Sequence, residues 1–164
     1  MANAIRGHQK QLFVSLISPQ DINAGKTGNY ICLKDVEHVR ILISVGAMAA
    51  STNLTINKAK TAAAGSATQW LDWAETMIET NVSASYAEDA SPTKTFTRTT
   101  VTADTMALAT ANSLYSIEFD PIELGESYDY FTAVFSNPGA IDLVSAIAIL
   151  DMKVCGETPP EAYS

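Results

Sequence analysis

The chain has 164 residues, of which 47% are hydrophobic, and ten basic against eighteen acidic side chains give it a formal net charge of −8. That length suits one domain with a core of its own, and the negative charge argues against a protein that binds nucleic-acid phosphates. The sequence contains no run of about 18 apolar residues, and its first residues lack the apolar centre of a signal peptide, so we expect no membrane span and synthesis in the cytosol.

The ends of the chain differ from its middle. Residues 1–11 show no hydrophobic period, and they carry the basic side chains Arg6, His8 and Lys10, which form a candidate docking arm. Apolar residues alternate through 12–155, so this range is predicted to be the folded domain. Residues 156–164 contain two consecutive prolines and are predicted to form an extended tail.

Apolar and polar residues alternate in short stretches between turn residues, which is the pattern of β-strands. The predicted strands are 12–17, 29–33, 38–45, 53–58, 95–102, 114–119, 130–135 and 141–154. Pro19 is expected to end the first of them, because proline cannot donate a hydrogen bond to a neighbouring strand. Eight or nine short strands are typical of an all-β fold, so we predict a β-sandwich or jelly-roll-like single domain.

Two segments in the middle of the chain fit this pattern less simply. In 70–78, Trp70, Trp73 and Met77 are spaced as on a helix, and both a strand and a helix are compatible with the sequence. Residues 81–94 are rich in Ser, Ala and Asp and include a proline, so they are predicted to form a long exposed loop.

The last predicted strand is apolar on both of its alternating faces. One face carries valine, alanine, leucine and methionine, and the other carries Ile141, Leu143, Ile147 and Ile149. A strand of this kind must be covered on both sides. We therefore expect it either in the middle of a sandwich or at a seam between subunits, with these four residues as the candidate interface.

The two cysteines, Cys32 and Cys155, lie far apart in strand-like apolar surroundings. Buried free thiols are the expected state of such residues. A single bridge between them is the alternative.

The sequence offers little recognisable chemistry. Ala24-Gly25-Lys26-Thr27 resembles the end of a phosphate-binding loop, but Gln20 stands where the earlier glycine belongs, so a turn is predicted instead. His8 and His38 are the only histidines, and neither has a second ligand at metal spacing. The acidic stretch 118–129 lacks the order of an EF-hand loop and is expected to be a solvated surface, with a docking surface for a basic partner as the alternative. We predict no catalytic, cofactor or metal site, and hence no enzyme.

Two longer stretches resemble a family of small virion proteins of tailed bacteriophages, the head decoration or cement proteins. They are ISPQDINAGKTGNYICLKDVEHVRILISVGAM (17–48) and SLYSIEFDPIELGESYDYFTAVFSNPGAIDLVSAIAIL (113–150). The first combines a polar turn with a strand that ends in Gly-Ala, and the second leads through an aromatic strand to the apolar final strand. The resemblance implies a protein on the capsid surface that binds and stabilises the shell of the major capsid protein. It also implies a homo-oligomer, such as a trimer around a local axis.

Two other functions compete with this interpretation. A head-tail connector, neck or tail- or fibre-associated protein would also be a structural virion component. A carbohydrate-binding β-sandwich would use Trp70, Trp73, Tyr128 and Tyr130 as stacking residues.

Overall fold

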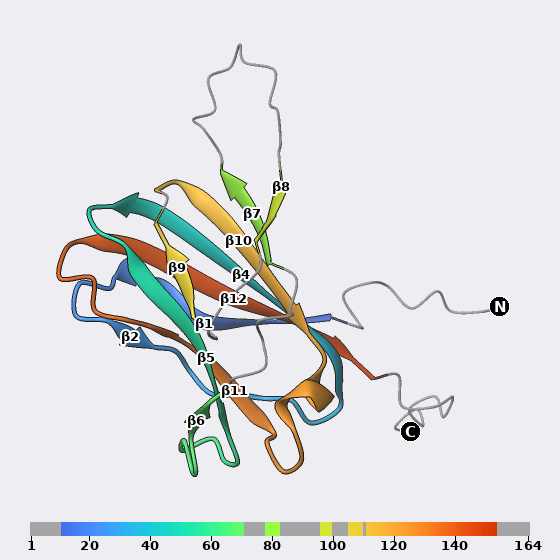
Figure 1. Cartoon of the computed structure of the whole chain (residues 1–164). Coiled ribbons are helices and arrows are strands. Elements are labelled where there is room, and N and C mark those ends of the chain that lie inside the picture. The colour runs from blue at the N-terminus through green and yellow to red at the C-terminus, as the bar shows by residue number, and fades with distance from the viewer. Residues whose placement is uncertain (1–10, 71–77, 83–95, 100–104, 110, 154–164) are drawn as a thin grey trace, which may run out of the picture.

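The structure, a computed structural model, describes residues 11–70, 78–82, 96–99, 105–109 and 111–153. In these residues the chain forms twelve β-strands and one short 3₁₀ helix, Pro121–Leu124. The strands build two antiparallel sheets that lie in two layers (Figure 1). The predicted all-β, sandwich-like single domain is confirmed.

The larger sheet, which we call sheet A, has the strand order β1-β12-β4-β10-β7-β8. Its strands are β1 (Gln11–Asp21), β12 (Asp142–Met152), β4 (Val36–Met48), β10 (Ser113–Phe119), β7 (Ile78–Val82) and β8 (Phe96–Thr99). In sheet B the order is β2-β11-β5-β6, with β3 paired to β11 and β9 to β5. The strands of sheet B are β2 (Lys26–Thr27), β11 (Tyr130–Phe135), β5 (Thr52–Ala59), β6 (Thr68–Gln69), β3 (Ile31–Cys32) and β9 (Met106–Leu108).

The hydrophobic core lies between the two sheets, because each strand turns its apolar alternate residues toward the other layer. On β4 these residues are Val39, Ile41, Ile43 and Val45, which are at most 2% exposed, as the alternation predicts. Aromatic rings join the layers: the ring centroids of Trp70 and Phe119 lie 5.1 Å apart, and those of Phe119 and Phe131 lie 5.3 Å apart.

Strand β1 continues through Pro19, and the prediction that Pro19 ends it is wrong. The strand forms the edge of sheet A, where a missing N–H leaves no partner strand unsatisfied. Its pairing with β12 shifts register between Ser15 and Ile17 and again between Ile17 and Gln20. These irregularities let the chain pass the proline without leaving the sheet.

Other predicted boundaries differ by a few residues. Gln11 belongs to β1 and not to an arm, and 81–82 belong to β7, so the predicted loop starts too early. The remaining loop residues 83–95, segment 71–77, arm residues 1–10 and tail 156–164 lie outside the described residues.

In the Ala24-Gly25-Lys26-Thr27 stretch, Ala24 belongs to the predicted turn, whereas Lys26 and Thr27 form the short strand β2. Gly25 has a φ of +77°, a conformation that side-chain-bearing residues rarely adopt. At Gly28 a Cβ atom would lie 2.9 Å from the carbonyl oxygen of Leu16. The glycines therefore serve the passage of the chain from sheet A to sheet B.

The part of the chain that the structure describes has no helix with the length and hydropathy of a transmembrane span.

Candidate interaction surface

Strand β12 presents two apolar faces in different surroundings. Its core face carries Val144, Ala146, Ala148 and Leu150, which are all at most 2% exposed. On the outer face, Leu143 is 45% and Ile147 is 44% exposed, and Ile149 is half-buried. No described element covers this outer face, because sheet B packs on the other side. The described residues therefore cover only one face of β12, and of the two predicted surroundings a seam between subunits is compatible with this exposure.

Neighbouring strands extend the apolar surface across sheet A. The pairing register places Phe13 of β1 opposite Ile149 and Leu42 of β4 opposite Ile147. Leu114 of β10, which is 38% exposed, lies opposite Ser44 on the same face. We call this set the apolar stripe; its members are Phe13, Leu42, Leu114, Leu143, Ile147 and Ile149.

Ile141, the fourth residue of the predicted interface, lies just before β12. It is 63% exposed, and its carbonyl oxygen accepts a hydrogen bond of 3.3 Å from the backbone N–H of Ala49. The structure thus brings Leu143, Ile147 and Ile149 together on one face and places Ile141 at the end of that face. The predicted arm residues Arg6, His8 and Lys10 lie outside the described residues.

Charged side chains border one end of the apolar stripe. Arg40 lies opposite both Ile149 and Glu118, and its Nε donates a hydrogen bond to Glu118 Oε1. His38 Nδ1 lies 2.7 Å from Asp120 Oδ1, and its Nε2 lies 3.7 Å from Glu118 Oε2. We call these four residues the ion-pair cluster. His38 therefore lies on the side of β4 that faces away from the core. Most charges at this border of the stripe are paired within the chain.

The rest of the acidic stretch is exposed surface, as predicted. Glu123 Oε1 accepts a hydrogen bond of 2.7 Å from the backbone N–H of Asp120 at the start of the 3₁₀ helix. Glu126 and Asp129 are exposed. Within the described ranges, no group of three or more His, Cys, Asp and Glu side chains is arranged to hold a metal ion.

Asp142 is a structural residue that the sequence analysis missed. It is fully buried at the start of β12, and its Oδ1 accepts hydrogen bonds from the backbone N–H groups of Ala49 (2.8 Å) and Ala50 (3.2 Å). Its own N–H donates to Asp21 Oδ1 at 3.1 Å. The side chain of Asp142 therefore ties the connection between β4 and β5 to the start of β12, and its backbone N–H ties the start of β12 to the end of β1. A carboxylate on the core-facing side of an apolar strand was the available signal.

The aromatic residues proposed for carbohydrate stacking are not gathered on one surface. Trp70 is fully buried in the core, so its ring cannot stack on a ligand. Tyr128 is half-buried, with Lys58 Nζ 4.6 Å and Lys60 Nζ 5.5 Å from its ring centre. Trp73 lies outside the described residues. The part of the hypothesis that rests on Trp70 is wrong.

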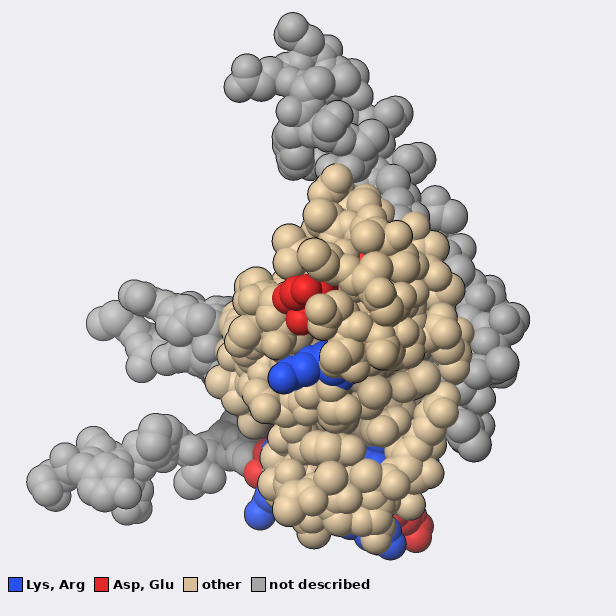
Figure 2. Space-filling view, turned by 90° about the vertical axis from the view of Figure 1, so that its left-hand side faces the viewer, with Lys and Arg blue, Asp and Glu red and all other residues tan. Residues whose placement is uncertain are grey.

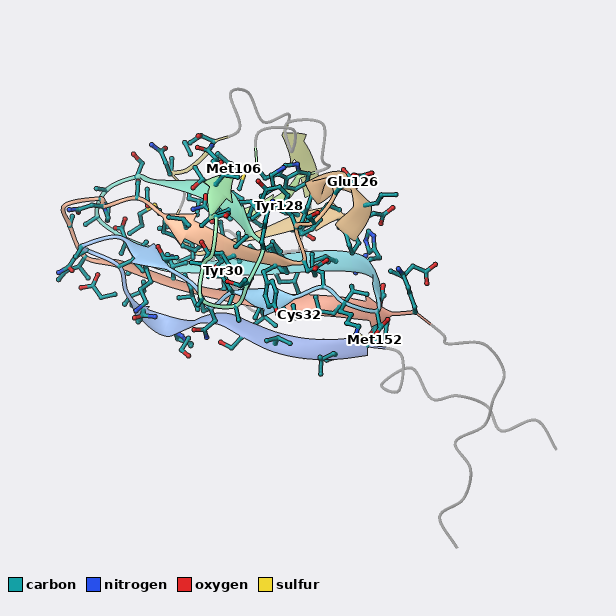
Figure 3. The ribbon with its side chains drawn as sticks, turned by 90° about the horizontal axis from the view of Figure 1, so that it is seen from below. Tyr30, Cys32, Met106, Glu126, Tyr128 and Met152 are labelled. Atoms are coloured by element: carbon teal, nitrogen blue, oxygen red, sulfur yellow. The ribbon has the colours of Figure 1, made fainter. Side chains whose placement is uncertain are left out.

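Cys32 is an exposed free thiol, and the prediction that it is buried is wrong. In the short strand β3, Ile31 points into the core and Cys32 therefore points away from it. Cys32, which is labelled in Figure 3, is paired with Tyr130 of β11 in the strand register, and a hydrogen bond between the two side chains raises the pKa of Tyr130. Cys155 lies outside the described residues.

A solved structure of a prophage-derived protein is similar to this chain. No protein-family model matches the chain, and no curated protein matches its sequence. The crystal structure of the SPBc2 prophage-derived protein YomS superimposes with a TM-score of 0.46 and 10% identity, covering 85% of this chain and 92% of that one. At this level of similarity, function has to be argued from the surface of the chain itself.

Proposed function

We propose that the chain is a structural virion protein of a tailed phage, which binds the shell of the major capsid protein as a decoration or cement protein. The observation that carries this proposal is the apolar stripe on an acidic protein, because it gives the chain a surface through which copies on a shell can adhere to one another. Scattered apolar side chains are normal on a protein surface, whereas a contiguous apolar patch indicates a surface made for contact. The protein would then act by adhesion, and the two stretches that resemble phage head proteins support this role.

The sparse, paired charges on the described surface also suit a protein that binds to other proteins over a broad contact area. Figure 2 views the end of the sandwich where β4 leads into β5 and β11 into β12, and it shows only small groups of charged side chains on a largely uncharged described surface. In the ion-pair cluster, Arg40 and His38 both contact carboxylates of the same chain. Such a surface can lie against a protein shell without leaving many charges unpaired.

A shell offers many identical sites, so that weak contacts suffice. Each copy needs only modest affinity if neighbouring copies also touch one another, because the contacts then act together across the lattice. We assign the contact with the shell to the basic arm, with Arg6, His8 and Lys10, whose positive charge contrasts with the acidic remainder of the chain.

The experiment that tests this function is co-sedimentation of the purified protein with heads of the encoding phage that lack it. We expect binding to saturate at hundreds of copies per head. Charge reversal of the arm, Arg6→Glu with Lys10→Glu, should weaken binding, whereas Ile122→Asp, at an 86% exposed apolar residue outside the stripe, should leave it unchanged.

The number of bound copies separates the structural alternatives. About a dozen copies at one vertex would indicate a neck or connector protein, as expected from ring symmetries. No binding to heads at any concentration would contradict the proposed function.

A further inference from the structure

We infer that a second copy of this chain covers the apolar stripe, so that the outer faces of two sheets A pack against each other around a two-fold axis. This inference rests on the proposed function, which treats the apolar stripe as a contact surface. The inference adds that the partner of the stripe is a second copy of the chain. The contact with the shell is then made by other surfaces of the dimer.

The exposed apolar area fits one protein interface. A large apolar side chain presents roughly 200 Å² when fully exposed. Phe13, Leu143, Ile147 and Leu114 are 62%, 45%, 44% and 38% exposed. Together they offer on the order of 400 Å² of apolar surface, about half of the roughly 800 Å² that each partner contributes to a standard interface. Since a little over half of such an interface is apolar, the stripe suits its centre.

The stripe alternates large and small side chains in a way that matches a copy of itself. The pairing register sets Ser15 opposite Ile147, Ser116 opposite Leu42, and Ser44 opposite Ser145. Large side chains of one sheet can therefore fill the spaces over the serines of a facing sheet, which is how two layers interdigitate in a sandwich. A surface that docks on its own copy needs this self-complementarity.

The charges around the stripe favour a like partner over an oppositely charged one. Arg40 is paired with Glu118, His38 contacts Asp120, and Asp151 Oδ1 accepts a hydrogen bond of 2.8 Å from Gln11 Nε2. These groups are satisfied within one chain, so the face requires apolar surface and shape from its partner and not a complementary charge. Two acidic chains can meet here because the border of the stripe includes Arg40 and His38 beside its carboxylates.

The edge of sheet A is less suited to self-association than its face. Strand β1 carries two register shifts and Pro19, and such features interrupt the row of backbone groups that another strand would need for pairing. A second copy that added a strand to β1 would have to pair with an irregular backbone. The strands β12, β4 and β10 instead offer the outer face of the sheet, where contact is made by side chains.

Mass measurement by light scattering after size exclusion, over a range of protein concentrations, tests the inference with the full chain. We expect the wild type to have the mass of two chains and Ile147→Asp that of one, with the dissociation constant raised by a factor of roughly 100 because a charge would be buried in the interface. The control Ile122→Asp should stay dimeric. A second stripe variant, Phe13→Ser, should also weaken the dimer. Because Phe13 is exposed in the monomer, this substitution should leave the fold of the single chain intact.

Three results would overturn the inference: a wild type that is monomeric throughout, a mass of three chains, or an Ile147→Asp variant that remains dimeric. Binding to heads is measured on the same samples. A monomeric wild type that binds heads would refute the second copy and leave the proposed function standing. A dimer that depends on Ile147 but ignores heads would support the second copy and contradict the proposed function.

Discussion

The two faces of β12 are both apolar but lie in different environments. On β12 the core face carries Val144, Ala146, Ala148 and Leu150, and the outer face carries Leu143, Ile147 and Ile149 around Ser145. Sheet B covers the first face, and no described element covers the second. The larger aliphatic side chains are thus the exposed ones. The comparison teaches that an apolar strand face indicates burial somewhere, but not whether the same chain provides the cover.

The strongest test of the difference between the two faces is to place the same charge on each of them and compare the loss of stability. Ile43→Asp on the core face of β4 should cost roughly 4 kcal/mol of unfolding free energy or more, because it buries a charge without a partner. Ile147→Asp on the outer face should cost about 0.5 kcal/mol in the monomer, since the carboxylate reaches water. Urea unfolding followed by circular dichroism, at a concentration where the chain is monomeric, measures both. Equal losses would mean that the outer face is covered within the chain.

A smaller effect is expected from the polar exception on the core face. Asp142→Ala should lower the free energy of unfolding by about 2 kcal/mol, because the N–H group of Ala50 loses its acceptor and that of Ala49 keeps only the 3.3 Å hydrogen bond to the carbonyl oxygen of Ile141. Asp151→Ala is the control, since its half-buried carboxylate binds the exposed side chain of Gln11 and its loss should cost about 0.5 kcal/mol or less. The same urea titration compares the two. If Asp142→Ala were as stable as Asp151→Ala, the buried carboxylate would not hold the connection between β4 and β5.

The polar border of the outer face should contribute less still. Arg40 and Glu118 are 49% and 36% exposed, so Arg40→Ala should cost less than about 1 kcal/mol, and the cost should decrease further in high salt. A double-mutant cycle with Glu118→Ala isolates the coupling between the two side chains. Coupling that is large and independent of salt would show that the cluster is more deeply buried than the exposed fractions indicate.

The smallest expected effect lies on sheet B, at the pair formed by Cys32 and Tyr130. The hydrogen bond with Cys32 raises the pKa of Tyr130 above its ordinary value, so the folded protein keeps the phenol proton to higher pH than the unfolded chain does. The stabilisation is therefore complete below the pKa of the unfolded chain and is lost as pH rises through the folded pKa. Ultraviolet absorbance of tyrosinate, referenced to Tyr130→Phe, follows the titration. Cys32→Ala should lower the pKa toward its ordinary value; an unchanged titration would exclude the hydrogen bond as the cause.

Local patterns in the sequence predicted most of the strands and their faces. Alternation with a period of two is a property of neighbouring residues, so Val39 to Val45 on β4 and Tyr115 to Phe119 on β10 could be assigned to the core without knowledge of any partner. The same rule identified Leu143, Ile147 and Ile149 as one face of β12. It also separated His38 and Arg40 from the core.

Features that depend on distant residues could not be predicted in this way. Pro19 is tolerated because β1 lies at a sheet edge, which depends on strand order. Cys32 is exposed because Ile31 is the residue of β3 that faces sheet A, and the amides that donate to Asp142 Oδ1 lie more than ninety positions earlier in the chain. The contact between His38 of β4 and Asp120, the residue that follows β10, likewise joins segments that only the sheet brings together.

By itself, the amino-acid sequence determined that this protein is built from strands and which side chains share a face, because both follow from the geometry of adjacent residues. The tertiary structure alone decided which of the two apolar faces of β12 is enclosed. A strand face becomes enclosed only when a second layer packs on it. That layer is sheet B, whose strands come partly from segments far from β12 in the chain and partly, as with β11, from the segment just before it. The outer face has no such layer among the described residues, and for that reason it became the candidate interaction surface.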